Sequence, residues 1–202
     1  MLRLDDFEVL TFDCYGTLID WETGICRALE PVFAAHGAEW APERVLELFG
    51  ELEAEAERGE YREYRAVLGA VLEGLGARLG FRPAAAEVAA FSGSVGDWPA
   101  FPDSAGALRA LQRRYRLAVV SNVDDDLFAA SAARLQVAFD WVVTAQQVRS
   151  YKPCLRNFRA AFARIGVPQA RILHVAQSLF HDIAPANVLG LSCVWVNRRQ
   201  GK

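Results

Sequence analysis

The stretch Val9-Leu10-Thr11-Phe12-Asp13-Cys14-Tyr15-Gly16-Thr17-Leu18, residues 9–18, decides the fold class of this chain. An apolar run ends abruptly at the carboxylate of Asp13, and a Gly-Thr turn follows. This pattern is typical of a buried strand in a parallel sheet, with a functional group just past its C-terminal end. Ligands of open α/β sheets bind at that edge. Because Asp is also a common turn residue, Asp13 alone does not separate a catalytic role from a structural one.

The overall composition is that of a soluble globular protein. The chain has 202 residues, of which 52% are hydrophobic and 23% charged, and its net charge is −3. This length allows one large domain or a core with an insertion. The slightly acidic charge balance gives no basic footprint for nucleic acid. No segment has the pattern of a signal peptide or a membrane span, so we expect no membrane partner.

The cysteines are scattered along the chain. Cys14, Cys26, Cys154 and Cys193 show no CxxC spacing. This arrangement favours reduced thiols over a zinc site or a disulfide framework. We therefore expect a cytoplasmic location.

Residues 19–97 are predicted to form a helical subdomain, because apolar residues recur there at helical spacing without a strand pattern between them. The predicted helices cover Trp21–His36, Pro42 to the acidic run Glu51–Glu57, Tyr61–Leu79 and Pro83–Ser92. The acidic run is interpreted as a solvated helix face without chemistry. The apolar face of Tyr61–Leu75 is interpreted as the core of the subdomain, with a homodimer contact as the alternative.

After Pro102, helices and short apolar strands alternate strictly. The predicted order is helix Ser104–Arg114, strand Leu117–Val120, helix Asp126–Arg134, strand Trp141–Thr144, helix Asn157–Ile165, strand Ile172–Val175, helix Ala184–Leu189 and strand Ser192–Val196. Such alternation predicts an α/β fold with a doubly wound parallel sheet. Residues 1–18 and 98–202 would form this core, and residues 19–97 would be inserted after the first strand.

Polar side chains follow four of the predicted strands. In chain order they are Asp13; Ser121 and Asn122; Lys152; and Gln177, Ser178 and Asp182. Right-handed crossovers bring the C-terminal ends of all strands to one edge of the sheet, so these groups are expected to converge. Each has a structural explanation of its own, such as a helix cap. Together they predict one active site.

Five segments resemble the haloacid dehalogenase superfamily in their order and spacing. They are FDCYGTL (12–18), VVSN (119–122), SYKP (150–153), HVAQSLFHD (174–182) and GLSCVWVNR (190–198). The resemblance covers the whole chain. It implies a Rossmann-like core with a helical cap inserted after the first strand.

The resemblance also implies roles for the catalytic residues. Asp13 matches the nucleophile of the superfamily, which forms an aspartyl ester that water then hydrolyses. Lys152 would keep Asp13 ionised and offset charge in the transition state. Thr17 and Ser121 would hold the anionic group of the substrate. Asp182 would orient Lys152 or the attacking water.

Two positions indicate which bond is cleaved. Phosphatases of the superfamily carry an acidic Asp two residues after the nucleophile and a Gly-Asp pair that helps to bind Mg²⁺. This chain has Tyr15 and Gln177 at those places, which disfavours Mg²⁺. If a metal does bind, Asp13 and Asp182 would be its ligands. Because an alkoxide would lack a proton donor, the substitutions favour halide, which leaves as an anion.

Tyr15 is similar to the L-2-haloacid dehalogenases of type II, which need no metal. By this similarity Asp13 would displace halide from C2 of a small anionic 2-haloacid, without a cofactor. The candidate substrate- and halide-binding residues are Tyr15, Asn122, Gln177 and Ser178.

The cap departs from that family at the position of its halide-binding arginine. Gly50 stands there in this chain. Arg44, or Arg62 and Arg65, would have to replace the arginine, and solvated helix charges are the favoured explanation for all three.

Three positions of the core depart as well: Gln177 and Leu179 stand where that family has Ser and Asn, and Phe158 stands where it has an aromatic hydroxyl. Three hypotheses therefore stay open. The first is a dehalogenase, and the second is another hydrolase of the superfamily, such as an atypical phosphatase or an enzyme that opens a strained C–N bond. The third is a non-catalytic binding protein on the same fold, against which the retention of Asp13 and Lys152 argues.

Overall fold

A five-stranded parallel sheet forms the centre of the computed structural model, which describes residues 2–198. Its strands are β1 (Val9–Phe12), β2 (Arg116–Ser121), β3 (Trp141–Thr144), β4 (Ile172–Ala176) and β5 (Ser192–Trp195). They lie in the order β3-β2-β1-β4-β5. After β1, the chain adds β2 and β3 on one side of it, and then β4 and β5 on the other side. This confirms the predicted α/β fold class and puts the ligand-binding edge of such sheets at the C-terminal end of β1.

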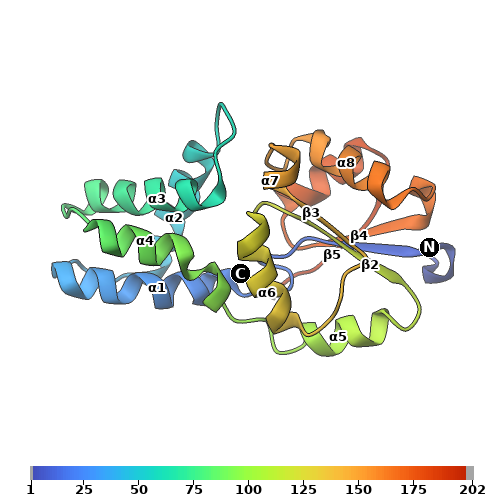
Figure 1. Ribbon diagram of the computed structural model, residues 1–202, viewed down its shortest axis with the longest axis horizontal. Helices are drawn as coiled ribbons and strands as arrows, with labels where there is room; N and C mark the ends of the chain where they lie inside the picture. Colours follow the sequence, from blue (N-terminus) through green and yellow to red (C-terminus); the bar gives the residue numbers. More distant parts are fainter. Residues whose placement is uncertain (1, 199–202) are drawn as a thin grey trace.

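Helices cover both faces of the sheet (Figure 1). They are α5 (Ser104–Leu111) and α6 (Asp125–Leu135) on one face, α8 (Leu155–Ile165) and α9 (Ala184–Val188) on the other, and the short α7 (Ala145–Val148) after β3. Side chains alternate across a strand, so Leu117 and Val119 of β2 pack into the first core. Ala118 and Val120 pack into the second. Both faces of the central strands are therefore apolar.

Four helices lie together beside the C-terminal edge of the sheet (Figure 1). They are α1 (Trp21–His36), α2 (Pro42–Ala56), α3 (Tyr64–Leu79) and α4 (Ala85–Gly93), called the cap helices below. The side chains of Val67, Leu68, Val71, Leu72 and Leu75 are fully buried among them. This apolar face is thus core of the cap helices. The division into two domains after residues 18 and 97 stays a prediction.

The chain passes from the sheet to the cap helices and back through two adjacent segments. Ile19 forms an antiparallel bridge with Ala100. The N–H of Asp20 donates to Pro99 O at 2.8 Å, and the N–H of Phe101 donates to Leu18 O at 3.0 Å. This pairing holds the turn after Asp13 next to the cap helices.

Helix boundaries differ from the sequence-based ones where side chains or turns intervene. Helix α3 begins at Tyr64, not at residue 61, because the carboxylate of Asp124 accepts the N–H groups of Tyr64 (2.9 Å) and Arg65 (3.0 Å). Helix α5 ends at Leu111, where a turn begins. Sequence analysis missed α7 and the short helical turns η1 (Leu4–Asp6), η2 (Ser94–Asp97), η3 (Gln169–Arg171) and η4 (Leu179–Ile183).

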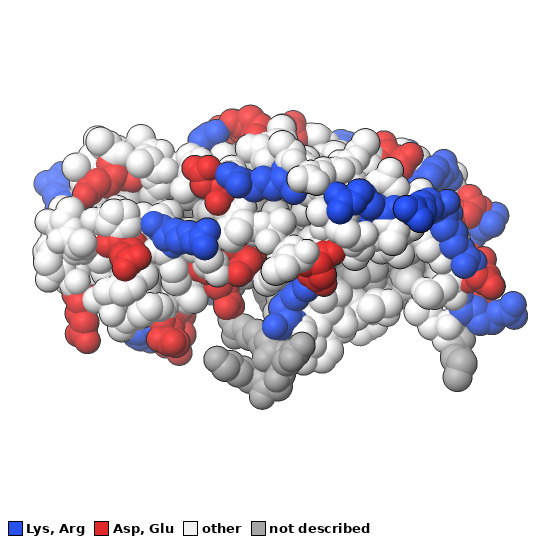
Figure 2. Space-filling model, turned by 90° about the horizontal axis from the view of Figure 1, so that it is seen from below, with Lys and Arg blue, Asp and Glu red and all other residues white. Residues whose placement is uncertain are grey.

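The charged side chains on the face drawn in Figure 2 are interspersed, with acidic groups among the basic ones. Among residues 2–198, no helix combines the length and the apolar character that crossing a membrane requires.

The cap that Asp124 provides for α3 predicts a stability difference. Replacing Asp124 by Ala leaves two N–H groups at a buried helix end without an acceptor, so the free energy of unfolding should fall by about 2 kcal/mol. The neighbouring Asp126 forms an exposed ion pair with Arg65, and Asp126→Ala should cost less than about 1 kcal/mol. Urea unfolding of both variants measures the difference, and equal losses would contradict the capping role.

Candidate active site

The carboxylate of Asp13 is held from two sides. Asp13 follows β1 and is only 6% exposed. Its Oδ1 accepts a hydrogen bond from Lys152 Nζ at 2.8 Å, and its Oδ2 accepts one from Thr17 Oγ1 at 2.6 Å. Thr17 Oγ1 in turn accepts the N–H of Gln177 at 2.9 Å. Gly16, with a φ of 91°, supplies the left-handed turn that brings Thr17 back to Asp13.

The ammonium of Lys152 joins three strand ends in the buried floor of the site. Besides Asp13, it donates to Asp182 Oδ1 at 2.7 Å and to Val120 O at 2.9 Å, which satisfies its three protons. Burial by itself would lower the pKa of Lys152. The charges of Asp13 and Asp182 outweigh burial and raise this pKa above its usual value, so the group stays charged.

Asp182 is fully buried and has a second partner in His174. His174 Nε2 lies 2.9 Å from Asp182 Oδ1, and His174 Nδ1 lies 2.9 Å from Thr11 Oγ1. Burial would raise the pKa of Asp182, but Lys152 and His174 lower it, so Asp182 is a carboxylate. Its Oδ2 has no hydrogen-bond partner among the described residues. Sequence analysis missed His174, whose one signal is its place inside the otherwise apolar strand β4.

Ser121 and Asn122 stand at the end of β2 and differ in their hydrogen bonding. Asn122 is paired with the main chain of Lys152: its Nδ2 donates to Lys152 O at 3.0 Å, and its Oδ1 accepts the Lys152 N–H at 2.7 Å. The Ser121 hydroxyl is buried and has no partner among the described residues. Asn122 therefore positions the segment that carries Lys152, and Ser121 keeps a free hydroxyl beside the cavity.

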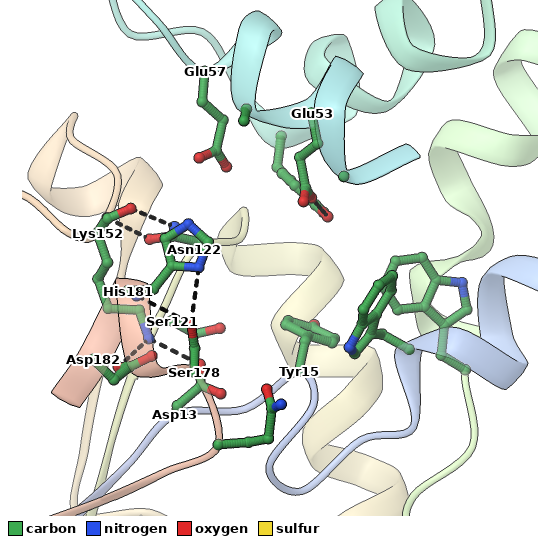
Figure 3. A pocket seen from close by; sticks show the side chains of 16 residues that line it. Asp13, Tyr15, Glu53, Glu57, Ser121, Asn122, Lys152, Ser178, His181 and Asp182 are labelled. Atoms are coloured by element: carbon green, nitrogen blue, oxygen red, sulfur yellow. Dashed lines mark hydrogen bonds and ion pairs between the residues drawn. The ribbon is translucent and has the colours of Figure 1, made fainter. Parts of the chain in front are cut away.

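These groups open onto a cavity of about 290 Å³ (Figure 3). Its lining comprises Asp13, Tyr15, Trp21, Gly50, Glu53, Ala54, Glu57, Tyr64, Trp98, Ser121, Asn122, Lys152, Gln177, Ser178, His181 and Asp182. All predicted site residues except Thr17 are in this list, and Thr17 binds Asp13 from behind. The structure thus brings the predicted residues together.

Aromatic and polar side chains shape the cavity walls. Tyr15 OH is hydrogen-bonded to Ser131 Oγ at 3.0 Å, and its ring lies edge-on to Trp98 with centroids 5.6 Å apart. Ser178 Oγ accepts the N–H of His181 at 3.0 Å. Burial and then the Lys152 charge lower the pKa of His181, so its imidazole is neutral near pH 7. Burial raises the pKa of the Tyr15 hydroxyl, so Tyr15 forms part of the cavity wall and does not release its proton near pH 7.

The carboxyl groups of Glu53, in α2, and of Glu57, the residue that caps the C-terminus of α2, enter the cavity, and this corrects the interpretation of the run Glu51–Glu57. Glu53 and Glu57 line the cavity, whereas Glu51 and Glu55 are exposed. Tyr64 OH donates to Glu53 Oε1 at 2.6 Å. Burial raises the pKa of Glu53 to about 7, and burial together with Glu53 raises that of Glu57 to about 9. Residues four apart share one helix face, so Glu53 and Glu57 face the cavity while Glu51 and Glu55 face solvent.

The cap arginines proposed as halide ligands lie elsewhere. Arg44 pairs with Glu47 on the surface, and Arg65 pairs with Asp126. Arg62 donates to the carbonyl of Ala56. None of them is part of the cavity lining, in which Lys152 is the only cationic residue among those that the structure describes.

The donor set does not fit a divalent metal ion. The carboxylates of Asp13 and Asp182 already share the Lys152 ammonium, and Gln177 supplies only an uncharged oxygen. Within residues 2–198, no three His, Cys, Asp or Glu side chains are grouped as metal ligands. Metal independence itself stays a prediction.

The buried pair of Lys152 and Asp182 predicts a pH-dependent loss of stability. Since the folded-state pKa of Asp182 is lowered, its stabilisation is present above the unfolded pKa near about 4 and is lost as pH falls through the folded value. Asp182→Asn should lower the free energy of unfolding by about 3 kcal/mol at neutral pH, and by less in acid. Urea unfolding at both pH values tests this.

The control for that variant is Asp103→Asn, which removes an exposed partner of Arg198. It should change the free energy of unfolding by less than about 1 kcal/mol. A loss in Asp182→Asn that does not shrink in acid would contradict the role of its charge.

Comparisons with known proteins find relatives along nearly the whole chain. The sequence is 24% identical to (S)-2-haloacid dehalogenase 1 of Pseudomonas sp. (strain CBS-3), over 96% of this chain and 86% of the relative. It is 27% identical to (S)-2-haloacid dehalogenase 4A of Burkholderia cepacia, over 97% and 85%. The fold is shared with the defluorinating L-2-haloacid dehalogenase Rha0230 at a TM-score of 0.85 and 20% identity, over 96% and 82%.

The family assignment follows from a match over most of the chain. Residues 7–190 match the sequence model of the haloacid dehalogenase-like hydrolases. This confirms the resemblance seen in the five sequence segments. The chain belongs to the haloacid dehalogenase-like hydrolase family.

Proposed function

We propose that this hydrolase cleaves the carbon–halogen bond of a small 2-haloacid through an ester of Asp13. The observation that carries the proposal is the Asp13 carboxylate, held between Lys152 and Thr17 at a buried cavity floor, with Tyr15 where a proton donor for an alkoxide would stand. A carboxylate is a weak nucleophile, and desolvation in a defined orientation makes it more reactive. Similarity to proteins named (S)-2-haloacid dehalogenases over nearly the whole chain supports this choice.

In the first step an oxygen of Asp13 attacks C2 of the substrate from the side opposite the halogen. The new C–O bond forms as the C–halogen bond breaks, and the halide leaves with the electron pair. Lys152 stays protonated and offsets the charge of the reacting groups at the floor of the cavity. Tyr15 keeps its proton at this stage, because burial raises the pKa of its hydroxyl, and a leaving halide needs no proton.

In the second step water attacks the acyl carbon of the Asp13 ester. Asp182 Oδ2, which has no hydrogen-bond partner among the described residues, accepts a hydrogen bond from this water, while Lys152 and His174 hold Oδ1. The ester breaks to give the 2-hydroxy acid and free Asp13. The net reaction consumes one water and releases halide and a proton.

The substrate carboxylate is assigned to the free Ser121 hydroxyl. Ser121 is buried beside Asp13 and Lys152, and its hydroxyl lacks a partner among the described residues. A buried hydroxyl without a partner is costly unless a ligand satisfies it. Asn122 contributes indirectly, because its amide holds the Lys152 main chain.

Halide release tests the proposed activity. Incubation with L-2-chloropropionate or fluoroacetate in the presence of EDTA should release halide, and Asp13→Asn should reduce the rate by about 10³-fold or more, because the nucleophile is lost. Single turnover in ¹⁸O-labelled water, followed by mass spectrometry of the Asp13 peptide, should place label in that side chain. No halide above the Asp13→Asn background, or Mg²⁺-dependent turnover of p-nitrophenyl phosphate instead, would contradict the proposal.

Ser121→Ala tests the carboxylate subsite. Loss of one hydrogen bond to a charged group should raise KM by about tenfold, with a smaller change in kcat. Because the hydroxyl has no partner within residues 2–198, the free energy of unfolding should not fall by more than about 0.5 kcal/mol. Ser131→Ala is the matched control, since Ser131 binds Tyr15 outside the cavity. An unchanged KM in Ser121→Ala would assign the carboxylate elsewhere.

A further inference from the structure

The carboxyl groups of Glu53 and Glu57, called the roof pair below, face the nucleophile across the cavity. Figure 3 shows both side chains pointing into the cavity, Glu53 from α2 and Glu57 from the residue that caps its C-terminus, with Asp13 on the opposite side. They are four residues apart and so lie on one face of the helix. Glu55, between them in sequence, is exposed. Their place is thus set by the register of α2.

The cavity contains more carboxyl groups than its cation can neutralise. Asp13, Asp182 and the roof pair line it, and the one ammonium, Lys152, is already bonded to Asp13 and Asp182. The Glu57 carboxyl makes no side-chain hydrogen bond with any residue between 2 and 198, and Glu53 has Tyr64. Burial raises the pKa of Glu53, and burial followed by the nearby charge of Glu53 raises the pKa of Glu57.

Ionisable groups approach the roof pair from several other elements. They are Tyr64 of α3, Asp13 and Tyr15 after β1, Asp124 before α6, Tyr61 before α3, Tyr151 and Lys152 before α8, and His181 and Asp182 in η4. Arg62 binds the Ala56 carbonyl at the end of α2 and lies outside the cavity lining. Tyrosines and a neutral histidine add no cation to this list. An incoming anion therefore gains no attraction from the roof while the roof pair is ionised.

The displacement of halide determines where the leaving group goes. The attacking oxygen, C2 and the halogen must lie nearly in line. With Asp13 on the floor, the halide therefore departs toward the wall that α2 forms. Two carboxylates at this wall would repel it, whereas a carboxyl O–H would donate a hydrogen bond to it.

We propose that the roof pair binds the departing halide through a protonated carboxyl group, so that a cavity whose roof pair is ionised takes up a proton when it binds a halide. This proposal rests on the proposed function. In the step itself the electron pair of the C–halogen bond goes to the halide, and the roof O–H donates to that ion while keeping its proton. The O–H bond of a protonated roof carboxyl thus directs its positive end toward the halide, in a cavity whose described lining contains no arginine.

An independent observation shows that this cavity is built for a ligand. The Ser121 hydroxyl, 1% exposed, lines the cavity and has no partner in the described part of the chain. It lies in the cavity wall with Asp13 and Lys152, and the halide subsite lies at α2. A 2-haloacid carries its carboxylate and its halogen on the same carbon, so one small cavity can offer a separate donor to each.

Bromide alone is the probe that tests the proposal without turnover. Bromide NMR linewidths give its affinity between about pH 6 and about pH 10, and a pH electrode in weakly buffered protein records proton uptake. The wild-type affinity should fall by up to about tenfold per pH unit as the roof pair ionises, with proton uptake approaching one per bromide in that range.

The variants separate the roof pair from other titrating groups. The double variant Glu53→Gln with Glu57→Gln keeps amide donors and cannot ionise, so its bromide affinity should not change with pH. The exposed Glu55→Gln should behave like wild type, and Glu57→Gln alone should reduce the pH dependence if the double variant fails to fold. A wild-type affinity that is flat or undetectable at every pH, or a slope that persists in the double variant, would overturn the proposal.

The two proposals fail in different ways. Proton-linked bromide binding without halide release from any 2-haloacid would remove the proposed function and leave the roof pair as an anion site. Halide release with pH-independent bromide binding would keep the function and remove the role of the roof pair.

Discussion

The buried ammonium of Lys152 is the interaction on which the rest of the site depends. Its acceptors come from the ends of three different strands: Asp13 after β1, Val120 of β2 and Asp182 after β4. Lys152 is one of two lysines in a chain that otherwise uses arginine. A compact group with three diverging protons suits three converging oxygens, whereas a planar guanidinium does not. The strand order therefore has to place these ends next to one another.

Burying three charges together is costly unless every neighbour is oriented, and the structure provides this orientation. Thr17 holds the second oxygen of Asp13, and His174 holds Asp182 from inside the sheet. Asn122 binds both main-chain polar groups of Lys152. Asp13, Lys152 and Asp182 are thus held by neighbouring side chains, of which Thr17 and His174 lie outside the cavity lining. The Asp13 carboxylate is held in place by the protein's own hydrogen bonds.

Much of the sheet and the floor of the site could be predicted from the sequence. Alternating apolar strands and helices indicated the parallel sheet, and Asp13, Ser121, Lys152 and Asp182 stood at its strand ends because such sheets gather their C-terminal edges. These features depend on local patterns. The five motif segments and the family model gave the same assignment.

What could not be predicted depends on contacts distant in sequence. The start of α3 is set by Asp124, about sixty residues away, and local helical periodicity does not contain this contact. His174 looks like any polar interruption of a strand until Asp182 is placed beside it. In the run Glu51–Glu57, a glutamate every second residue hides which face is inward, since the apolar residues that would show it are few. Only the packing of α2 over the sheet edge distinguishes Glu53 and Glu57 from Glu51 and Glu55.

The attachments of the cap helices also limit how the cavity can open. On one side the paired segments around Ile19 and Ala100 join them to the sheet through main-chain hydrogen bonds. On the other, Asp124 binds the first N–H groups of α3. A hinge at the paired segments would leave the backbone intact, but a swing about that hinge has to detach α3 from Asp124. Asp124 therefore ties the start of α3 to the start of α6, and a swing of this kind would also have to break the neighbouring ion pair between Arg65 and Asp126.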